Sequence, residues 1–141
     1  GTSIPPDVMR QLRSLLWGNQ GVPPPSWKQG FFFSRHAGLQ FGLVQRQGGP
    51  CGVLAAVQAH VLAALHKPTS GFNTTPRTPE QHAALAAALA ESLWAARVGP
   101  AAFLVLPEGE AAAPGAVARL GYDQLSRAVA QHSATTKEAL V

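Results

Sequence analysis

The single cysteine of the chain, Cys51, is the residue best suited to covalent chemistry. It follows the turn Gly48-Gly49-Pro50 and begins a run of small and aliphatic residues that extends to Leu65. A thiol at the start of a helix faces unpaired backbone N–H groups and the positive end of the helix dipole, which both favour the nucleophilic thiolate. The same N–H groups could stabilise an oxyanion formed on a carbonyl that the sulfur attacks. The pattern therefore indicates a candidate nucleophile.

A second candidate is Gln45, which lies six residues before Cys51. Its side-chain amide offers N–H donors without a charge that would compete for the thiolate, so it could assist the backbone in holding an oxyanion. Gln47 is the nearby alternative. An arbitrary cysteine at a helix start is more often a small packed hydrophobe than a nucleophile, so the spacing alone does not decide between these roles.

Three motifs in a fixed order favour the nucleophile over the packed cysteine. The first is Leu15-Leu16-Trp17-Gly18, the second runs from Trp27 to Ser34 with the sequence Trp-Lys-Gln-Gly-Phe-Phe-Phe-Ser, and the third is the segment Gly42–Ala59 around the cysteine. In order and spacing they resemble the MINDY family of deubiquitinases, in particular its FAM188-like branch, most clearly over residues 12–66.

The resemblance implies a cysteine isopeptidase that hydrolyses ubiquitin chains, with a family preference for lysine-forty-eight linkages. Cys51 would be the catalytic nucleophile and Gln45 the oxyanion-hole side chain. The implied fold is mixed α/β (α+β), a partial papain-like cysteine-protease fold with a buried central helix that starts at Cys51 and is packed by further helices and short strands. Residues 1–131 would form the N-terminal portion of the catalytic domain, and residues 132–141 a disordered tail.

A cysteine nucleophile also needs a base, and this is where the chain departs from the family. The family's catalytic histidine lies well downstream on a strand and precedes an aromatic residue. None of the five histidines has that context; they are His36, His60, His66, His82 and His132. We therefore expect a fragment that lacks its own base, in agreement with a first residue that is Gly instead of Met. The alternative is a non-catalytic remnant or pseudoenzyme that acts as a ubiquitin-binding or interaction module.

Composition fits an intracellular globular domain. The 141 residues are 46% hydrophobic and 13% charged, enough for one core. A lone cysteine excludes an intrachain disulfide and suits a reducing compartment, so we expect a cytoplasmic or nuclear protein. No apolar run is long enough to span a membrane, and no spacing of Cys or His indicates a metal site or a cofactor. The expected partners are ubiquitin and polyubiquitin chains.

The net charge of +4 does not indicate nucleic-acid binding. The eleven Lys and Arg residues are scattered and are not interleaved with aromatic side chains as in RNA-binding motifs. The charge reflects the scarcity of acidic residues. We expect a mildly basic, solvated surface and no nucleic-acid partner.

Apolar periodicity and turn residues predict the remaining elements. We expect helices over residues 5–17, 51–65, 78–98 and 123–131, short strands near residues 39–44 and 103–106, and loops between them. Thr78 should cap the third helix, with Gln81 at the capping-box position. Phe31-Phe32-Phe33 and Trp27 are expected to anchor the central helix, and Gln58 and His60 to hold hydrogen-bonded core positions.

Overall fold

The computed structural model describes residues 2–18, 24–69, 71–113, 116–119, 124 and 127–141. Its contacts divide the chain into two compact units. The sheet unit comprises residues 1–23 and 103–134, and the helix-pair unit comprises residues 24–102 and 135–141. Helices and antiparallel strands occur together, so the expected mixed α+β class is confirmed.

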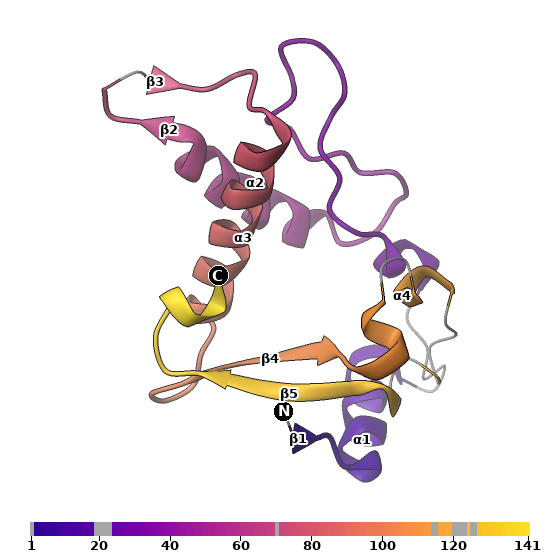
Figure 1. Ribbon diagram of the computed structural model, residues 1–141. Helices are drawn as coiled ribbons and strands as arrows, with labels where there is room; N and C mark the ends of the chain where they lie inside the picture. Colours follow the sequence, from indigo (N-terminus) through magenta and orange to yellow (C-terminus); the bar gives the residue numbers. More distant parts are fainter. Residues whose placement is uncertain (1, 19–23, 70, 114–115, 120–123, 125–126) are drawn as a thin grey trace. The chain divides into compact units, whose positions relative to one another are not determined.

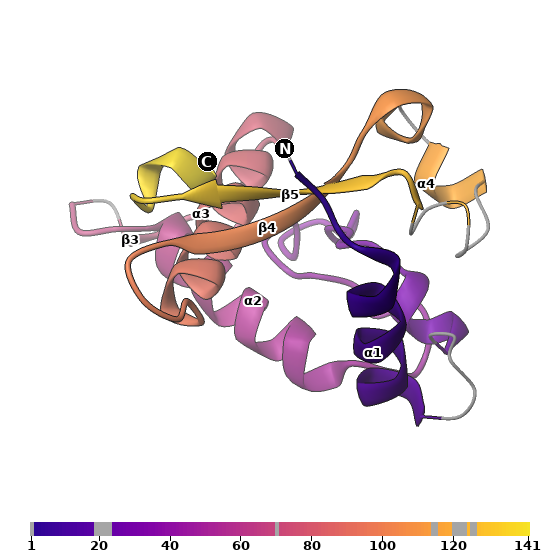
Figure 2. The same cartoon turned by 90° about the horizontal axis from the view of Figure 1, so that it is seen from below.

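The sheet unit contains a three-stranded sheet in the order β1-β5-β4. Strand β1 (Thr2–Ser3) runs antiparallel to β5 (Val129–Ala134), and β5 lies beside β4 (Ala102–Pro107), as Figure 2 shows. Helix α1 (Pro6–Trp17) has a proline at its start and ends at Gly18, whose φ of 59° suits glycine. The short helices η3 (Gly109–Ala112) and α4 (Ala116–Arg119) complete the unit.

The C-terminal part of this unit differs from the expectation. The helix predicted to extend to about Gln131 is wrong at its end, because residues 129–131 belong to β5; Asp123, its predicted cap, lies outside the described residues. Residues 132–134, placed in the expected disordered tail, continue the same strand. The run Val-Ala-Gln-His-Ser-Ala alternates between the two faces of the sheet, and pairing with β1 and β4 outweighs its weak helical pattern.

The helix-pair unit is built on α2 (Cys51–Leu65) and α3 (Thr78–Ala95), which pack against each other (Figure 1). Helix α2 begins at Cys51 as predicted. A hairpin of β2 (His66–Lys67) and β3 (Gly71–Phe72) joins the two helices, and the short helices η2 (Pro25–Lys28) and η4 (Glu138–Leu140) lie at the ends of the unit.

The core of this unit is one stripe of α2. Val57, Val61 and Leu65 recur every four residues and pack against Ala84 and Ala88 of α3. The expectation of a buried central helix holds only along this stripe, since the other residues of α2 are exposed or only partly buried. Val53, for example, keeps 49% of its surface exposed. The many alanines on the other faces bury little area each, so the helix does not need to be enclosed.

Helix α3 begins one residue earlier than predicted. Its N-cap is Arg77, whose backbone N–H donates to Glu80 Oε2 at 2.9 Å, so Glu80 takes the capping-box position expected of Gln81. A charged acceptor in the first turn also interacts favourably with the helix dipole. Gln81 is thereby free to donate to the carbonyl oxygen of Gln40 at 2.8 Å.

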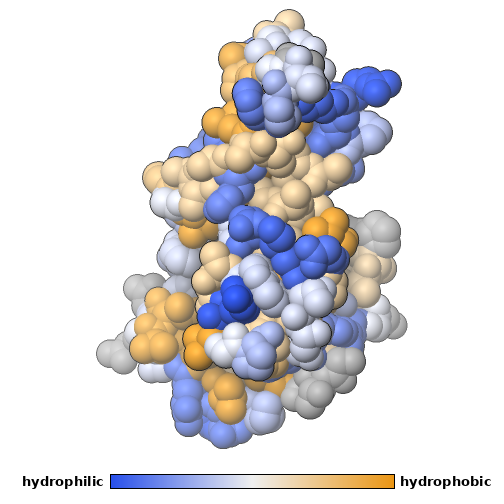
Figure 3. All heavy atoms as spheres, turned by 90° about the vertical axis from the view of Figure 1, so that its left-hand side faces the viewer, coloured by the Kyte–Doolittle hydropathy of each residue, from blue (hydrophilic) through white to orange (hydrophobic). Residues whose placement is uncertain are grey.

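Several large apolar side chains remain exposed in the described residues, among them Leu15, Val98 and Phe103. On the face seen in Figure 3, hydrophobic residues in orange stand among hydrophilic ones in blue. No described helix is both long and apolar enough to cross a membrane.

Candidate active site

Cys51 is the first residue of α2, and its side chain is exposed. Its backbone N–H donates to the carbonyl oxygen of Gly49 at 2.7 Å. The N–H of Leu54 donates to the carbonyl oxygen of Pro50 at 3.0 Å. The amides of Gly52 and Val53 fall in the first turn, where an α-helix provides no internal acceptor. The sulfur therefore stands at a helix start where backbone donors remain available for an oxyanion.

Gln45 points at the sulfur. Its Nε2 lies 3.4 Å from Cys51 Sγ and 3.0 Å from the carbonyl oxygen of Gln47. An amide nitrogen carries two N–H groups, so one can hold the side chain to Gln47 while the other faces the thiol. Gln47 takes part through its backbone oxygen. The geometry therefore brings together the two residues predicted as catalytic, with Gln45 instead of Gln47 as the side-chain donor.

Gln29 fixes the same turn, and sequence reasoning assigned it no role. Its Oε1 accepts from the N–H of Arg46 at 3.1 Å, and its Nε2 donates to the carbonyl oxygen of Gln47 at 3.4 Å. The Gln29 side chain thus holds the backbone of the two residues that follow Gln45. The only signal in the sequence was the position of Gln29 within the Trp27–Ser34 motif.

Gly49 explains why the turn before Cys51 needs a glycine. Its φ is 151°, and a Cβ placed there would lie 2.7 Å from the Cβ of Ser26 and 2.8 Å from its Oγ. Gly48 has no heavy atom within 4 Å of the equivalent position. Of the two glycines, only Gly49 has no room for a side chain, because η2 contacts the turn there.

The turn follows a short hairpin formed by residues 32–44. Phe33 and Leu43 form an antiparallel bridge, and hydrogen bonds join Ser34 to Gly42 at 2.8 Å and Val44 to Phe32 at 2.7 Å. A strand was predicted from Leu39 onwards. The structure has only this bridge, because residues 36–42 are used in successive tight turns.

Gln58 attaches this hairpin to α2. Its Oε1 accepts from the N–H of Leu43 at 2.5 Å, and its Nε2 donates to the carbonyl oxygen of Phe41 at 3.1 Å. The predicted hydrogen-bonded role of Gln58 is confirmed. Since Gln81 holds Gln40 from α3, both helices anchor the hairpin that leads to Gln45.

No histidine is hydrogen-bonded to Cys51 in the part of the chain that the structure describes. His60 lies nine residues further along α2, about 13 Å away along the helix axis at the usual rise. His132 lies on β5 with its Nε2 3.5 Å from Glu108 Oε1. Nor do the described residues contain a group of three or more side chains suited to hold a metal ion. In the described residues, the arrangement has a thiol with N–H donors near it but no base in contact with the thiol.

Comparison with known proteins identifies the family. The conserved domain of the deubiquitinating enzymes MINDY-3/4 matches residues 13–141. "Probable ubiquitin carboxyl-terminal hydrolase MINDY-4" of Mus musculus is 36% identical over 109 residues, which are 72% of this chain and 15% of that protein. "Ubiquitin carboxyl-terminal hydrolase MINDY-3" of Homo sapiens is 40% identical over 65 residues, 42% of this chain and 14% of that protein.

The match is short relative to these proteins. The "MINDY-3 homolog" of Drosophila melanogaster is 45% identical over 56 residues, 38% of this chain and 10% of that protein. The chain thus spans about a tenth to a seventh of the curated relatives that it matches. No solved structure matches it significantly. Because the conserved domain covers nearly all of the sequence, the chain belongs to the MINDY-3/4 family of deubiquitinases.

Proposed function

We propose that the chain carries the nucleophile of a cysteine-dependent deubiquitinase that hydrolyses isopeptide bonds in ubiquitin chains. Cys51 is the nucleophile, and Gln45 is the side-chain donor of the oxyanion hole. The observation that carries this proposal is the 3.4 Å contact between Gln45 Nε2 and the exposed Cys51 Sγ. The relatives that are named ubiquitin carboxyl-terminal hydrolases supply the substrate class.

In the proposed reaction the thiolate of Cys51 attacks the isopeptide carbonyl, and a sulfur–carbon bond forms while the carbonyl oxygen becomes negative. That oxygen accepts hydrogen bonds from Gln45 and from the first-turn amides of α2. Collapse of the intermediate expels the lysine amine, which takes up a proton, and water then hydrolyses the thioester. A histidine that does not contact Cys51 in the described structure must act as acid and base.

The finer features follow from the same resemblance. We propose that residues 1–131 belong to a papain-like catalytic domain, that lysine-forty-eight-linked chains are its substrates, and that it works in the reducing cytoplasm or nucleus. The alternative is a non-catalytic ubiquitin-binding module. One observation favours it: the described partner of the thiol is an amide, not a base.

The proposal is tested with ubiquitin that carries a vinyl sulfone at its C-terminus, which traps a nucleophilic cysteine as a covalent adduct. The 141-residue chain is compared with Cys51→Ala, Gln45→Ala and Gln47→Ala, and cleavage of lysine-forty-eight-linked chains is followed in parallel. We expect no adduct with Cys51→Ala, and roughly a hundredfold slower cleavage of the chains with Gln45→Ala, because one donor to the oxyanion on the isopeptide carbonyl is lost. Gln47→Ala keeps the backbone oxygen that holds Gln45 and should react nearly normally.

Equal effects of the two glutamine variants would contradict the role of Gln45. If the unaltered chain forms no adduct although iodoacetamide alkylates Cys51, the enzyme proposal fails. Retained binding of ubiquitin chains in that case would point to the binding module.

A further inference from the structure

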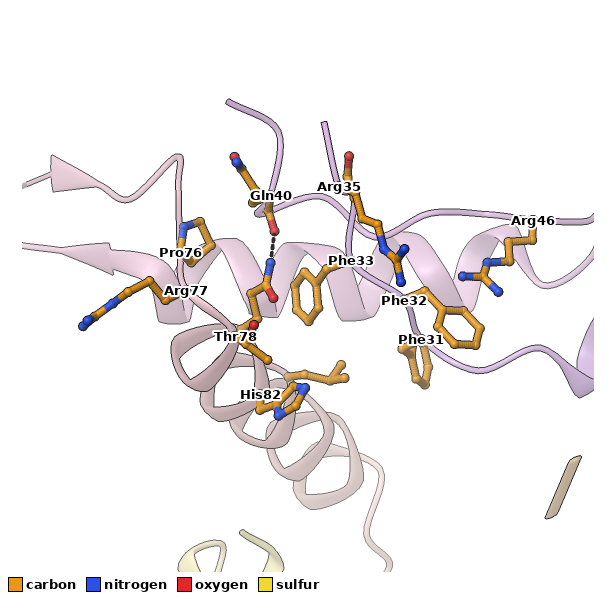
Figure 4. A pocket seen from close by; sticks show the side chains of 13 residues that line it. Phe31, Phe32, Phe33, Arg35, Gln40, Arg46, Pro76, Arg77, Thr78 and His82 are labelled. Atoms are coloured by element: carbon orange, nitrogen blue, oxygen red, sulfur yellow. Dashed lines mark hydrogen bonds between the residues drawn. The ribbon is translucent and has the colours of Figure 1, made fainter. Parts of the chain in front are cut away.

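A pocket of about 550 Å³ opens in the helix-pair unit, between the hairpin of residues 32–44 and the first turns of α3 (Figure 4). Its apolar lining comes from the consecutive residues Phe31, Phe32 and Phe33, with Leu85 from α3. Phe32 keeps 39% of its surface exposed. The pocket thus offers aromatic surface to a ligand, while Phe31 and Phe33 also pack against the core.

The charged lining is basic among the residues that the structure describes. Three of the eight arginines of the chain line the pocket, Arg35, Arg46 and Arg77, and no described acidic side chain does. Figure 4 shows Arg35 and Arg46 near Phe32, and the guanidinium of Arg46 stacks 3.8 Å from the centre of that ring. A stacked arginine still has N–H groups at its edge, available to an oxygen acceptor.

The three arginines are not equivalent. Arg77 already pairs with Glu80, its Nε lying 3.6 Å from Oε2. Within the part of the chain that the structure describes, no carboxylate pairs with Arg35 or Arg46. These two guanidinium groups therefore carry uncompensated positive charge beside the aromatic lining. Arg77 and Thr78 also mark the N-terminal end of the 18-residue helix α3, whose dipole adds positive potential there.

We propose that this pocket binds an acidic segment of the protein substrate, with a carboxylate on Arg35 and Arg46 and a neighbouring apolar side chain on the phenylalanines. The inference rests on the proposed function, and it adds a second recognition site in the unit that carries the thiol, to which Arg46, the residue after Gln45, contributes. A protein segment fits better than a nucleic acid. The cations gather at one pocket instead of following a stripe, and the phenylalanines suit an aliphatic side chain as well as a base.

The test measures binding without catalysis. The 141-residue chain with Cys51→Ala is titrated against a short fluorescein-labelled peptide in which glutamate alternates with leucine, and fluorescence anisotropy is recorded. The control peptide has lysine in place of every glutamate. Arg35→Gln and Arg46→Gln are compared with Arg97→Gln, which removes the same charge from the C-terminal end of α3, where Arg97 stacks on Trp94.

We expect the acidic peptide to bind and the basic one not to bind. Arg35→Gln and Arg46→Gln should each weaken binding about tenfold, equivalent to one charge-assisted hydrogen bond of ~1.4 kcal/mol. Arg97→Gln should have little effect, and added salt should weaken binding. Circular dichroism verifies that each variant is folded.

Absence of binding by the acidic peptide would overturn the proposal. So would an equal loss with Arg97→Gln, which would indicate a general charge effect. Competition by a short oligonucleotide at the same concentrations would identify a general anion site instead. Because the thiol is absent, none of these outcomes depends on whether the chain cleaves ubiquitin, so the two proposals can fail separately.

Discussion

At the scale of single residues, the candidate site is a set of amide side chains arranged around one thiol. Gln45 contacts the sulfur, and Gln29 forms hydrogen bonds with the backbone of Arg46 and Gln47, the two residues that follow Gln45. Gln58 attaches the preceding hairpin to α2, the helix that begins at Cys51. Neutral amides can donate and accept at once without introducing a charge beside the thiol. The segments around the sulfur are therefore held by uncharged hydrogen-bonding groups.

Gly49 provides a sharp test of this arrangement. Gly49→Ala should displace the turn, because the new Cβ would lie 2.7 Å from that of Ser26 at a φ of 151°. We expect slower reaction of Cys51 with the ubiquitin probe and a lower Tm. Gly48→Ala is the matched control, since nothing lies within 4 Å of its Cβ position. Indistinguishable reaction rates and Tm values for the two variants would show that the contact with Ser26 does not constrain the turn.

Some residues of the site could be named from the sequence because a local pattern marks them. Type and spacing made Cys51 and Gln45 candidates, with Gln47 as the alternative, and the resemblance to the MINDY family assigned their expected roles. Gln58 followed from being polar within an apolar helix. Gln29 and Ser26 could not be assigned, because their contacts join residues 17 to 23 positions apart. Such contacts depend on how η2 folds back onto the turn, which no local pattern encodes.

At the scale of elements, α2 is stabilised through one face. Val61 is fully buried in the stripe that packs on α3, whereas Val53 on the same helix is half exposed. Val61→Ala should lower the free energy of unfolding by about 2 kcal/mol, because two buried methyl groups are lost and a cavity remains. Val53→Ala should change it by less than about 0.5 kcal/mol. Urea denaturation measures both, and similar losses would mean that α2 is enclosed on more than one side.

An ion pair joins the segment that follows β5 to α3. Lys137 Nζ donates to Glu91 Oε2 at 2.8 Å. This hydrogen bond is the main cause that lowers the pKa of Glu91 below 4.5 and raises the pKa of Lys137 above 10.5. The stabilisation is therefore lost as pH falls through the depressed pKa of Glu91, and again as pH rises through the raised pKa of Lys137.

We accordingly expect η4 to be ordered near neutral pH and to become mobile in acid. Heteronuclear NOE values of residues 138–140 should fall when Glu91 is protonated, and Lys137→Gln should lower them already at neutral pH. Lys67→Gln removes an equal charge elsewhere in the unit and should leave them unchanged. Low NOE values at every pH in the unaltered chain would instead support the disordered tail expected from the sequence.

At the scale of the whole molecule, the two units differ in how much apolar surface they bury. The helix-pair unit has Val57, Val61 and Leu65 in its core. In the described part of the sheet unit the buried hydrophobic residues are alanines, namely Ala111, Ala116, Ala130 and Ala134. Composition predicted one core for the chain without indicating that it would be confined to the helical part. Periodicity likewise marked the apolar stripe of α1, but not that these side chains would stay exposed.

This difference predicts unequal local stability. Full burial of a valine or leucine side chain contributes about 1.5–3 kcal/mol, several times the contribution of an alanine methyl group. In native-state hydrogen exchange, amides of α2 and α3 should therefore open with the largest free energies, and those of β5 with smaller ones. Val61→Ala should lower the protection of α2 and α3 together, because they share one core, and should affect β5 less. Equal protection in β5 and α2, falling in parallel in this variant, would mean that the units unfold as one.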